Sequence, residues 1–322
     1  MSDRVLVVGG TGGFGRAVIE ELLRRGLPTR CLVRDPSKAE RVLGSNPGLE
    51  VIQGNAEDGP AVLSASQNCG AIVHAVNFPY PQWVPHMAKA TAQVITAARA
   101  ANATILFPGN VYGLGPQSSG PLTEDAPNLP SADKGTLRVT IENSLQQAAE
   151  EGPERVIILR AGDYFGPTVR NGLVDPLFEN AMLGKPLRAI GKLDIPHQWA
   201  FVPDLARAAI DLLGASERLN AFEVVHFSGY VPPTQRDFLK LIAQQAGKPE
   251  LPVRAVPWSA LKVAAVFDRV IRELLELRYL FDSSVIMDGS KLKGLLPEFR
   301  ETPIEEAVLA TLESYRKAEE AS

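Results

Sequence analysis

The sequence has little cysteine and histidine and no long uncharged apolar run. Its 322 residues include two cysteines and four histidines. Cys31 and Cys69 are too few for a disulfide framework, so we expect free, buried thiols in a reducing compartment. No uncharged apolar stretch is long enough to span a bilayer, and Met1-Ser-Asp-Arg4 lacks the apolar core of a signal peptide. We therefore expect a cytoplasmic protein with no membrane partner.

The sequence also has neither an excess of positive charge nor a metal-binding cluster. The formal net charge is −4, so no basic field attracts nucleic acid. Cysteine, histidine and carboxylate residues do not recur at metal-ligand spacing, and a Gly-x-Ser-x-Gly nucleophile elbow is absent. Hydrophobic residues make up 45% and charged residues 22%, the balance of a globular protein with a sizeable core. The expected partner is a small-molecule substrate.

The first half of the chain alternates short apolar runs with helical patterns. Runs that are apolar at every position are typical of strands covered on both faces, and their alternation with helices indicates a parallel sheet. The predicted strands are Arg4–Val8, Thr29–Val33, Glu50–Gln53, Ala71–Val76, Ala103–Phe107 and Arg155–Leu159. The predicted helices are Phe14–Arg25, Pro36–Leu43, Trp83–Ala101 and Ala132–Glu151. The expected fold class is α/β, a Rossmann doubly wound parallel sheet.

After this alternation the pattern becomes irregular. We expect residues 1–167 to form the Rossmann domain, with returning segments near 197–227. Residues 168–196 and 228–322 are predicted to form a smaller α/β substrate-side domain. The returning segments are predicted as a strand at Gln198–Val202, a helix at Pro203–Leu213 and a strand at Phe222–Phe227. Amphipathic patterns predict further helices at Pro233–Gly247, Ser259–Leu280 and Ile304–Lys317.

A glycine-rich turn follows the first predicted strand. The stretch Val5-Leu-Val-Val-Gly-Gly-Thr-Gly-Gly-Phe-Gly15 runs from an apolar strand directly into an amphipathic helix. Gly9 permits the tight turn, Gly12 lets the backbone approach a diphosphate, and Gly15 lets the helix pack on the strand. Backbone N–H groups and the helix dipole then face the anion. The context predicts a dinucleotide-binding turn rather than a glycine-rich turn of purely structural use.

The spacing Gly9-x-x-Gly12-x-x-Gly15 resembles that of the atypical and extended short-chain dehydrogenase/reductase families, of the NAD(P)-dependent epimerase/dehydratase-like kind. The resemblance runs along most of the chain. Further landmarks are Asn55-Ala56, Val76-Asn77, Val111-Tyr112-Gly113, Leu159-Arg160, Phe165-Gly166-Pro167 and Phe201-Val-Pro-Asp204. This family resemblance implies that the chain binds NAD(P). The residues expected to contact it are Gly9, Thr11, Gly12, Gly13, Phe14, Gly15, Asn55, Ala56, Ala75, Val76, Asn77, Pro108, Arg138 and Asp163. Family members often form homodimers through helices equivalent to Trp83–Ala101 and Ala132–Glu151.

The end of the second predicted strand indicates which dinucleotide is bound. An NAD-specific site normally has an acidic residue there for the ribose 2′-hydroxyl. Here Arg34 occupies that region, and its guanidinium suits a 2′-phosphate, to which Lys38 adds positive charge. Asp35 is predicted to cap the following helix, although a shift of one residue would turn it toward the ribose. We expect NADP rather than NAD; the alternative is an ordinary solvated arginine at position 34.

The usual catalytic residues of the family are missing. In the family a Tyr and a Lys four residues later share one helix face, and a Ser or Thr stands four residues before the Val-Tyr-Gly landmark. Here Pro108 stands four residues before Tyr112, and the best alignment puts Lys134 and Arg138 in place of the Tyr and Lys. None of the six tyrosines has a lysine four residues on, so this absence does not depend on the alignment.

Three other residues are predicted to be catalytic. Arg138 cannot exchange protons near neutrality, so it is expected to hold the ribose or a carboxylate. Lys134 serves as a proton donor only if its surroundings favour the neutral amine. A solvated basic turn of a helix is the alternative for this pair. Tyr164 follows the sixth strand, where the family lines the nicotinamide end.

Several further positions are interpreted less sharply. His197 is expected near the substrate cleft, with a structural or surface histidine as the alternative, and Trp199 is expected in the core. His74 is expected to be a core histidine, and Asp204 to cap a helix. The loop 113–130 is rich in Pro, Gly and Ser and is long for a connection, which is typical of loops that carry function.

The first hypothesis for function is an NADP(H)-dependent oxidoreductase that acts on a small carbonyl-type substrate. Because the catalytic pair is missing, a second hypothesis is a non-catalytic NADP(H)-binding redox sensor or scaffold. The third is a sugar-nucleotide epimerase or dehydratase, against which the missing Tyr counts. The substrate itself is not indicated by any residue pattern.

Overall fold

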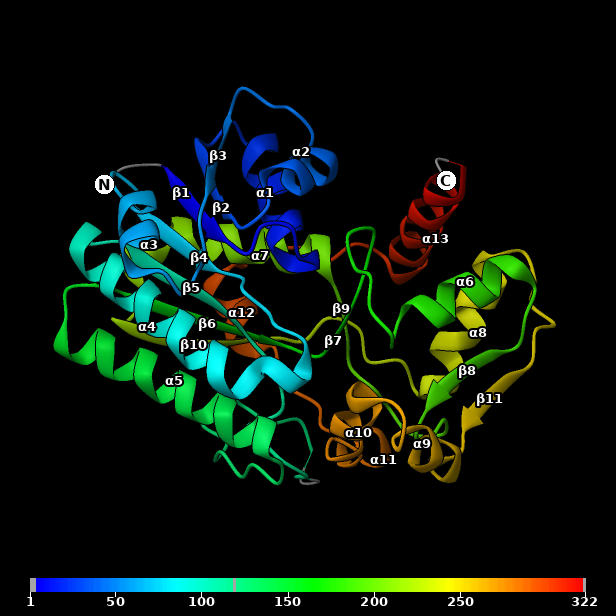
Figure 1. The fold of residues 1–322 in the computed structure, drawn as a ribbon. Helices are drawn as coiled ribbons and strands as arrows, with labels where there is room; N and C mark the ends of the chain where they lie inside the picture. The colour runs from blue at the N-terminus through cyan, green and yellow to red at the C-terminus, as the bar shows by residue number, and fades with distance from the viewer. Residues whose placement is uncertain (1–3, 118–119, 321–322) are drawn as a thin grey trace.

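A seven-stranded parallel sheet with helices on both faces forms the larger part of the molecule (Figure 1). The computed structural model describes residues 4–117 and 120–320, so the predictions for Met1–Asp3 and for part of the loop 113–130 fall outside the described residues. The strands are β1 (Val5–Val8), β2 (Thr29–Val33), β3 (Leu49–Gln53), β4 (Ala71–His74), β5 (Thr104–Gly109), β6 (Val156–Ala161) and β10 (Phe222–Phe227). Their order is β10-β6-β5-β4-β1-β2-β3, which confirms the doubly wound α/β fold.

Alternate residues of the central strands enter two separate cores, which explains why a strand such as β1 is apolar at every position. Val5 and Val7 of β1 pack into one core, whereas Leu6 and Val8 pack into the other. The first core is covered by α1 (Gly13–Arg24), α2 (Pro36–Leu43) and α7 (Val202–Gly214). The second core is covered by α3 (Gly59–Ala65), α4 (Trp83–Ala101) and α5 (Asp133–Glu151).

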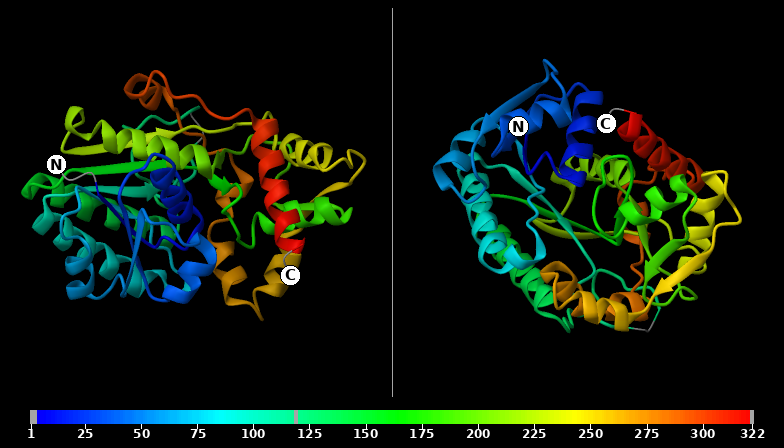
Figure 2. Two further views of the ribbon diagram at one scale, coloured as in Figure 1. Left: turned by 90° about the horizontal axis from the view of Figure 1, so that it is seen from above. Right: turned by 45° about the vertical axis from the view of Figure 1, so that its right-hand side comes forward.

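A smaller group of elements lies beside the carboxyl ends of the sheet strands (Figures 1 and 2). Its core joins Phe178, Phe238 and Tyr315, each from a different helix. Two short parallel ladders, β7 with β9 and β8 with β11, complete it. Its elements are β7 (Asp163–Phe165), α6 (Asp175–Leu183), β8 (Leu187–Ile190), β9 (Trp199–Phe201), α8 (Gln235–Gln245), β11 (Val253–Val256) and α13 (Ile304–Glu320). The division of the chain at residue 167 stays a prediction.

The chain returns to the large sheet through α7 and β10. Helix α7 packs against α1, and β10 pairs with β6 at the edge of the sheet. The prediction that Asp204 caps this helix is wrong, because α7 begins two residues earlier. Asp204 is instead buried, and it accepts hydrogen bonds from the backbone N–H and the hydroxyl of Thr302 at 2.6 and 2.8 Å. It also pairs with Arg207 at 2.6 Å, so one carboxylate ties the segment before α13 to α7.

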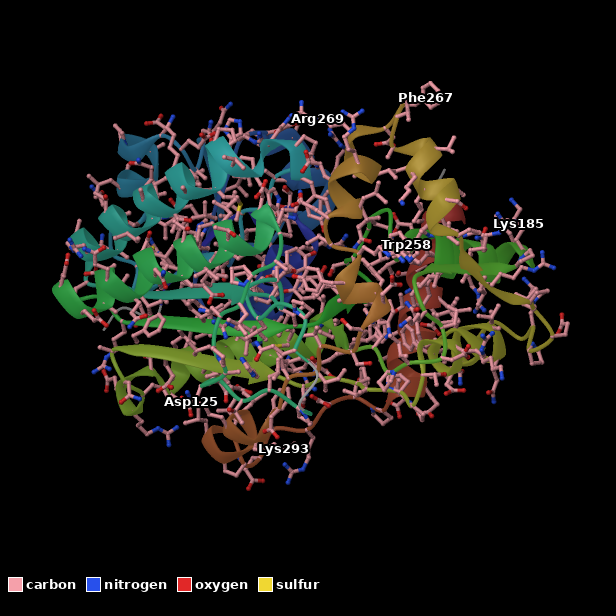
Figure 3. The ribbon with its side chains drawn as sticks, turned by 90° about the horizontal axis from the view of Figure 1, so that it is seen from below. Asp125, Lys185, Trp258, Phe267, Arg269 and Lys293 are labelled. Carbon is pink, nitrogen blue, oxygen red and sulfur yellow. The ribbon has the colours of Figure 1, made fainter. Side chains whose placement is uncertain are left out.

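The predicted helix Ser259–Leu280 is wrong as a single element. The structure has three helices there, α9 (Trp258–Ala264), α10 (Arg269–Leu275) and α11 (Tyr279–Asp282), followed by α12 (Ser290–Leu295). Asp268 starts a new helix because its carboxylate accepts hydrogen bonds from the N–H groups of Val270 and Ile271. The tip between α9 and α10 projects from the molecule and exposes Val266 and Phe267 (Figure 3).

Two buried histidines make stability depend on pH. Burial lowers the pKa of His74 to about 3 and that of His226 to about 4. Their pKa in the unfolded chain is about 6.5, so the unfolded state binds more protons below that pH. We expect the free energy of unfolding to fall by about 1.4 kcal/mol per histidine for each pH unit below about 6.5. Urea unfolding at pH 7.5, 6.0 and 5.0 measures this slope.

One variant tests whether the slope comes from these histidines. His226→Gln is expected to remove about half of it, because it removes one of the two buried imidazoles. Burial also raises the pKa of the Glu301 carboxyl, which makes the free energy of unfolding rise as the pH falls. This single group opposes the two histidines. An unchanged slope in His226→Gln contradicts the assignment.

Candidate active site

The turn between β1 and α1 presents backbone amides to an anion. Gly9 has a φ of +92°, and the N–H of Gly12 donates to the carbonyl oxygen of Gly9 at 3.1 Å. Gly12 is the N-cap of α1, and among the described residues no side chain caps this end of the helix. The N–H groups of the first turn therefore have no side-chain acceptor, and the helix dipole favours a negative group there.

The glycines of this turn allow a close approach of three backbone segments. A Cβ atom at Gly9 would lie 2.6 Å from the carbonyl oxygen of Ala75, which follows β4. A Cβ atom at Gly15 would come closer than 3.0 Å to the carbonyl oxygen of Gly9, a separation that real Cβ atoms essentially never show. The turn thus lies directly against the carboxyl end of β4.

The segment that follows β6 also lies against this turn. The rings of Phe14 and Tyr164 are 6.4 Å apart between centroids. The hydroxyl of Thr168 donates to the carbonyl oxygen of Gly13 at 2.8 Å. Asp163 and Tyr164, two predicted site residues, are therefore held beside the phosphate-binding turn.

The end of β2 carries an arginine free of the neighbouring carboxylate. The carboxylate of Asp35 accepts a hydrogen bond from the N–H of Lys38 at 3.0 Å, so its prediction as a helix cap is confirmed. Arg34 and Lys38 are both exposed beside it. Among the described residues Arg34 and Asp35 form no ion pair, while the Asp35 carboxylate caps α2.

The other predicted cofactor residues lie at the carboxyl ends of neighbouring strands. Asn55 and Ala56 follow β3, and Ala75, Val76 and Asn77 follow β4. Because β4 lies between β1 and β5, these residues share one edge of the sheet with the phosphate-binding turn. The side-chain oxygen of Asn55 accepts a hydrogen bond of 3.2 Å from the N–H of Glu57 in a local turn.

A buried guanidinium lies at the end of β5. Arg138 of α5 lies 4.7 Å from the ring centroid of Trp83 and 5.4 Å from that of Phe107. It donates to the carbonyl oxygen of Pro108 at 3.4 Å, while its Nε has no partner among the described residues. Burial lowers its pKa from the ordinary value, with nearby tyrosines opposing the shift. The alternative of a solvated basic turn is wrong for Arg138, which the packing makes a core cation.

Three tyrosines surround this arginine. The hydroxyls of Tyr80 and Tyr112 share a hydrogen bond of 2.8 Å. Burial raises the pKa of both, and raises the pKa of Tyr164 to about 12. The positive charge of Arg138 opposes the shift in all three, and the negative charge of Asp163 adds to it. All three phenols are therefore protonated and weakly acidic at neutral pH.

Lys134 is buried and paired rather than free. Its ammonium group forms ion pairs with Glu273 of α10 and with Glu276, which follows that helix. It also lies 5.2 Å from the ring centroid of Tyr80. The hydrogen bond from Lys134 holds the pKa of the Glu273 carboxyl below its ordinary value. Lys134 is therefore engaged by two carboxylates rather than free to meet a substrate.

A histidine–carboxylate pair completes the cluster. The Nε2 of His197 lies 2.7 Å from a carboxylate oxygen of Asp163. The imidazole is stacked against Phe281 at 6.0 Å and lies 5.0 Å from the ring of Trp199. The side chain of Asp163 is 25% exposed and that of His197 is 13% exposed, so both reach the surface of the cluster.

The predictions that His74 and Trp199 lie in the core are confirmed. His74 is fully buried and bonds to the hydroxyl of Thr91 at 2.9 Å. Trp199 belongs to the core of the smaller group of elements. Within residues 4–117 and 120–320 no three His, Cys, Asp or Glu side chains could hold a metal ion. None of the helices in the same ranges is long and apolar enough to cross a membrane.

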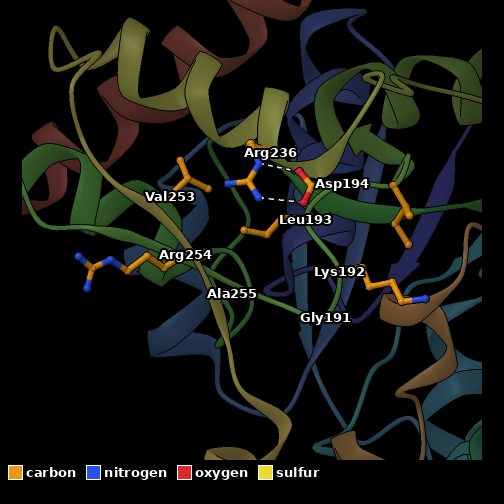
Figure 4. Close-up of a pocket in the computed structure, with 9 residues that line it drawn as sticks. Gly191, Lys192, Leu193, Asp194, Arg236, Val253, Arg254 and Ala255 are labelled. Atoms are coloured by element: carbon orange, nitrogen blue, oxygen red, sulfur yellow. Dashed lines mark hydrogen bonds and ion pairs between the residues drawn. The ribbon is translucent and has the colours of Figure 1, made fainter.

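A hollow of about 580 Å³ lies in the smaller group of elements, lined by residues 191–195, 236 and 253–255 (Figure 4). Arg236 and Asp194 pair across it with hydrogen bonds of 2.7 and 3.0 Å. None of its lining residues belongs to the predicted site. Because its facing charges satisfy each other, we assign the hollow no part in cofactor binding.

The sequence interpretation missed four residues of the cluster: Tyr80, Trp83, Glu273 and Glu276. Trp83 was assigned to a helix without a role, and Glu273 and Glu276 were placed on an amphipathic helix. Glu273 and Glu276 lie 139 and 142 positions after Lys134, so no spacing pattern connects them. Only the unbalanced positive charge of a buried Lys134 and Arg138 could have signalled a partner.

Comparison with known proteins relates the region of the candidate site to a known family. Residues 9–144 match the NAD(P)H-binding family. A 3-diazoavenalumate denitrifying reductase of Streptomyces sp is 28% identical over 277 residues, which cover 79% of this chain and 84% of that protein. An uncharacterised protein of Sinorhizobium fredii is 24% identical over 81% of this chain, which spans only 64% of its length. The dTDP-glucose 4,6-dehydratase DesIV of Streptomyces venezuelae, solved with NAD bound, shares the fold with a TM-score of 0.79 and 19% identity, over 99% of this chain and 98% of that one.

Proposed function

We propose that the chain is an NADP(H)-dependent oxidoreductase of the short-chain dehydrogenase/reductase, epimerase/dehydratase-like kind, which acts on a small carbonyl-type substrate. The match of residues 9–144 to the NAD(P)H-binding family and the fold shared with a dTDP-glucose 4,6-dehydratase support this proposal. The observation that carries this proposal is the uncapped amide end of α1 behind the Gly9–Gly15 turn. The cluster of Arg138, Tyr112 and Tyr164 lies at the adjacent strand ends, where a substrate would meet the cofactor.

The residues of this site fit the two ends of a dinucleotide. The turn from Gly9 to Gly15 would hold the diphosphate through backbone N–H groups. Arg138 would hold the ribose or a substrate oxygen, since its buried Nε lacks a partner among the described residues. When bound, the reduced nicotinamide supplies a hydride. The neighbouring aromatic rings would exclude water from the reacting carbonyl.

The preference for NADP depends in this proposal on Arg34. We expect Arg34→Ala to raise the Kd for NADPH about tenfold or more, because a charge-assisted contact to phosphate is worth about 1.5–3 kcal/mol. The Kd for NADH is expected to change less than about twofold. Titration of cofactor fluorescence measures both constants.

Arg41→Ala is the matched control, since Arg41 is an exposed arginine near the far end of α2, the helix that follows Arg34. We expect it to leave both constants unchanged. Equal weakening of NADPH and NADH by Arg34→Ala would show that this side chain does not read the 2′-phosphate.

The proposed activity is tested by following the absorbance of NADPH with benzaldehyde, 9,10-phenanthrenequinone and UDP-glucose. Oxidation of NADPH by a carbonyl compound supports the oxidoreductase. Conversion of UDP-glucose in a parallel sample with NADP⁺, detected by analysis of the sugar nucleotide and without net formation of NADPH, would support the sugar-nucleotide epimerase instead. No turnover by a protein that binds NADPH contradicts both.

One observation favours the non-catalytic alternative. Lys134 stands where the family has its catalytic Tyr, yet two carboxylates engage it. A redox sensor or scaffold would keep the phosphate-binding turn and lose such a residue. Tight binding of NADPH, silence with every carbonyl, and a change of oligomeric state between NADPH and NADP⁺ would support this function. A cytoplasmic location and a homodimer remain proposals as well.

A further inference from the structure

We propose that Asp163 and His197 form an acid–base pair that supplies the proton to the substrate oxygen, in place of the missing Tyr and Lys. The proposal rests on the proposed function and names the residues that complete it. It starts from the hydrogen bond of 2.7 Å between His197 Nε2 and the Asp163 carboxylate.

The carboxylate fixes which ring nitrogen faces the substrate. Because Asp163 accepts, the Nε2 of His197 carries the hydrogen and donates it. This leaves Nδ1 as the nitrogen that exchanges a proton with a ligand, and no described residue gives Nδ1 a partner. A carboxylate that orients an imidazole and stabilises its charged form is the arrangement needed for general acid–base catalysis.

Packing holds the imidazole in one orientation. Its ring lies nearly parallel to that of Phe281, with 9° between the planes, and Trp199 contacts its other side at 58°. The neighbouring backbone is fixed as well, because the hydroxyl of Ser284 donates to the carbonyl oxygen of Pro196 at 3.0 Å. Both residues therefore belong to the smaller group of elements, where Asp163 begins β7 and His197 precedes β9.

The pair lies beside the phosphate-binding turn and the buried tyrosines. Tyr164, next to Asp163 in β7, contacts Phe14 at the start of α1. Burial raises the pKa of Tyr80 and of Tyr112, and the negative charge of Asp163 adds to both shifts. The cofactor end of the site and the Asp163–His197 pair are therefore neighbours.

The other candidate donors are worse suited to the step. Burial raises the pKa of Tyr164 to about 12 and that of Tyr112 well above its ordinary value, so each gives up a proton reluctantly. Lys134 is already engaged in ion pairs with Glu273 and Glu276. Imidazole is the side-chain group that ordinarily gains and loses its proton between pH 5 and 8.

The step is balanced with a reduced dinucleotide as the second reactant. The carbonyl carbon gains a hydride from NADPH, and the carbonyl oxygen gains a proton from Nδ1 of the His197 imidazolium. The products are an alcohol, NADP⁺ and a neutral imidazole. The imidazole then regains its proton from water, while Asp163 remains a carboxylate throughout.

The first test does not depend on turnover. The four histidines are resolved by their ring ¹⁵N signals, and His74 and His226 stay neutral near pH 7 because burial lowers the pKa of each. We expect NADPH to shift the ring signals of His197. In Asp163→Asn the His197 signals are expected to report a changed tautomer. A His197 ring that does not respond to saturating NADPH overturns the proposal.

The second test uses the carbonyl compound that the wild-type protein reduces. His197→Gly is expected to lower kcat about 100-fold with the Kd for NADPH unchanged, because general acid catalysis contributes about 10²–10⁴-fold. Added imidazole is expected to restore at least a tenth of the lost activity, which the loss of a structural contact would not allow. Asp163→Asn is expected to lower kcat about tenfold. Tyr164→Phe tests the alternative donor, because it keeps the ring packing and removes only the hydroxyl.

The outcomes separate the two proposals. Loss of activity in Tyr164→Phe, with His197→Gly fully active, overturns the histidine as donor and leaves the oxidoreductase standing. NADPH binding that shifts His197 without turnover of any carbonyl contradicts both the oxidoreductase and the donor role. Failure of imidazole to rescue His197→Gly, with the fold and NADPH binding intact, also overturns the donor role.

Discussion

Gly15→Ala is expected to raise the Kd for NADPH at least about 100-fold, a loss of about 2.7 kcal/mol. The added methyl group would approach the carbonyl oxygen of Gly9, and also the backbone of Gly10, closer than carbon atoms tolerate. Backbone cannot move aside as a flexible side chain does, so α1 must shift away from the end of β1. That shift moves the amides of the first helical turn, which the dinucleotide would bind. Isothermal titration with NADPH measures the change.

Gly214→Ala is the matched control for this prediction. Gly214 ends α7, which packs on α1, and an added Cβ there meets nothing within 4 Å. We expect this variant to bind NADPH like the wild type and to unfold at the same temperature or slightly higher. Binding by Gly15→Ala within about threefold of the wild type would show that the glycine spacing does not shape a diphosphate site.

Asp204→Ala is expected to lower the free energy of unfolding by about 3 kcal/mol, because hydrogen bonds to a charged group are worth about 1.5–3 kcal/mol each. The carboxylate is 1% exposed and accepts two hydrogen bonds from Thr302. Its removal leaves the N–H of Thr302 without its acceptor and releases the segment before α13 from α7. Part of the loss is offset, because the Asp204 charge also contributes to the raised pKa of the neighbouring Glu301. Urea unfolding at pH 7.5 provides the measurement.

The control for this variant is Asp211→Ala on the same helix. Asp211 pairs with Arg25 at 2.7 Å, but both side chains are partly exposed, so we expect a loss below about 1 kcal/mol. If both variants lost the same free energy of unfolding, the number of ion pairs rather than the burial of a carboxylate would determine how much that carboxylate stabilises the fold.

The parts of the fold that local sequence specifies were predicted closely. The helix after the glycine-rich turn was expected at Phe14–Arg25 and runs from Gly13 to Arg24. Asp35 caps α2 as expected, because an Asp before a Pro at the first helical position is a local signal. Strands covered on both faces were recognised because every residue of β1 and of β6 is buried.

The parts that depend on distant residues were not predictable in the same way. A continuous helical pattern over Ser259–Leu280 conceals the break at Asp268, since Asp is tolerated within a helix and caps one equally well. The pairing of Lys134 with Glu273 depends on how α10 is placed against α5, which no spacing encodes. The sequence interpretation placed His197 near the cleft but could not pair it with Asp163, 34 positions earlier.

The position of β10 at the edge of the sheet matters while the protein is being made. This strand pairs with β6, yet the ribosome adds it only after α6, β8 and α7. Until Phe227 has left the exit tunnel, β6 presents a bare row of N–H and C=O groups to its surroundings. Such a row is a template for strands of other nascent chains. The most vulnerable stage of biosynthesis thus falls between residues 161 and 227, long after the phosphate-binding turn has emerged.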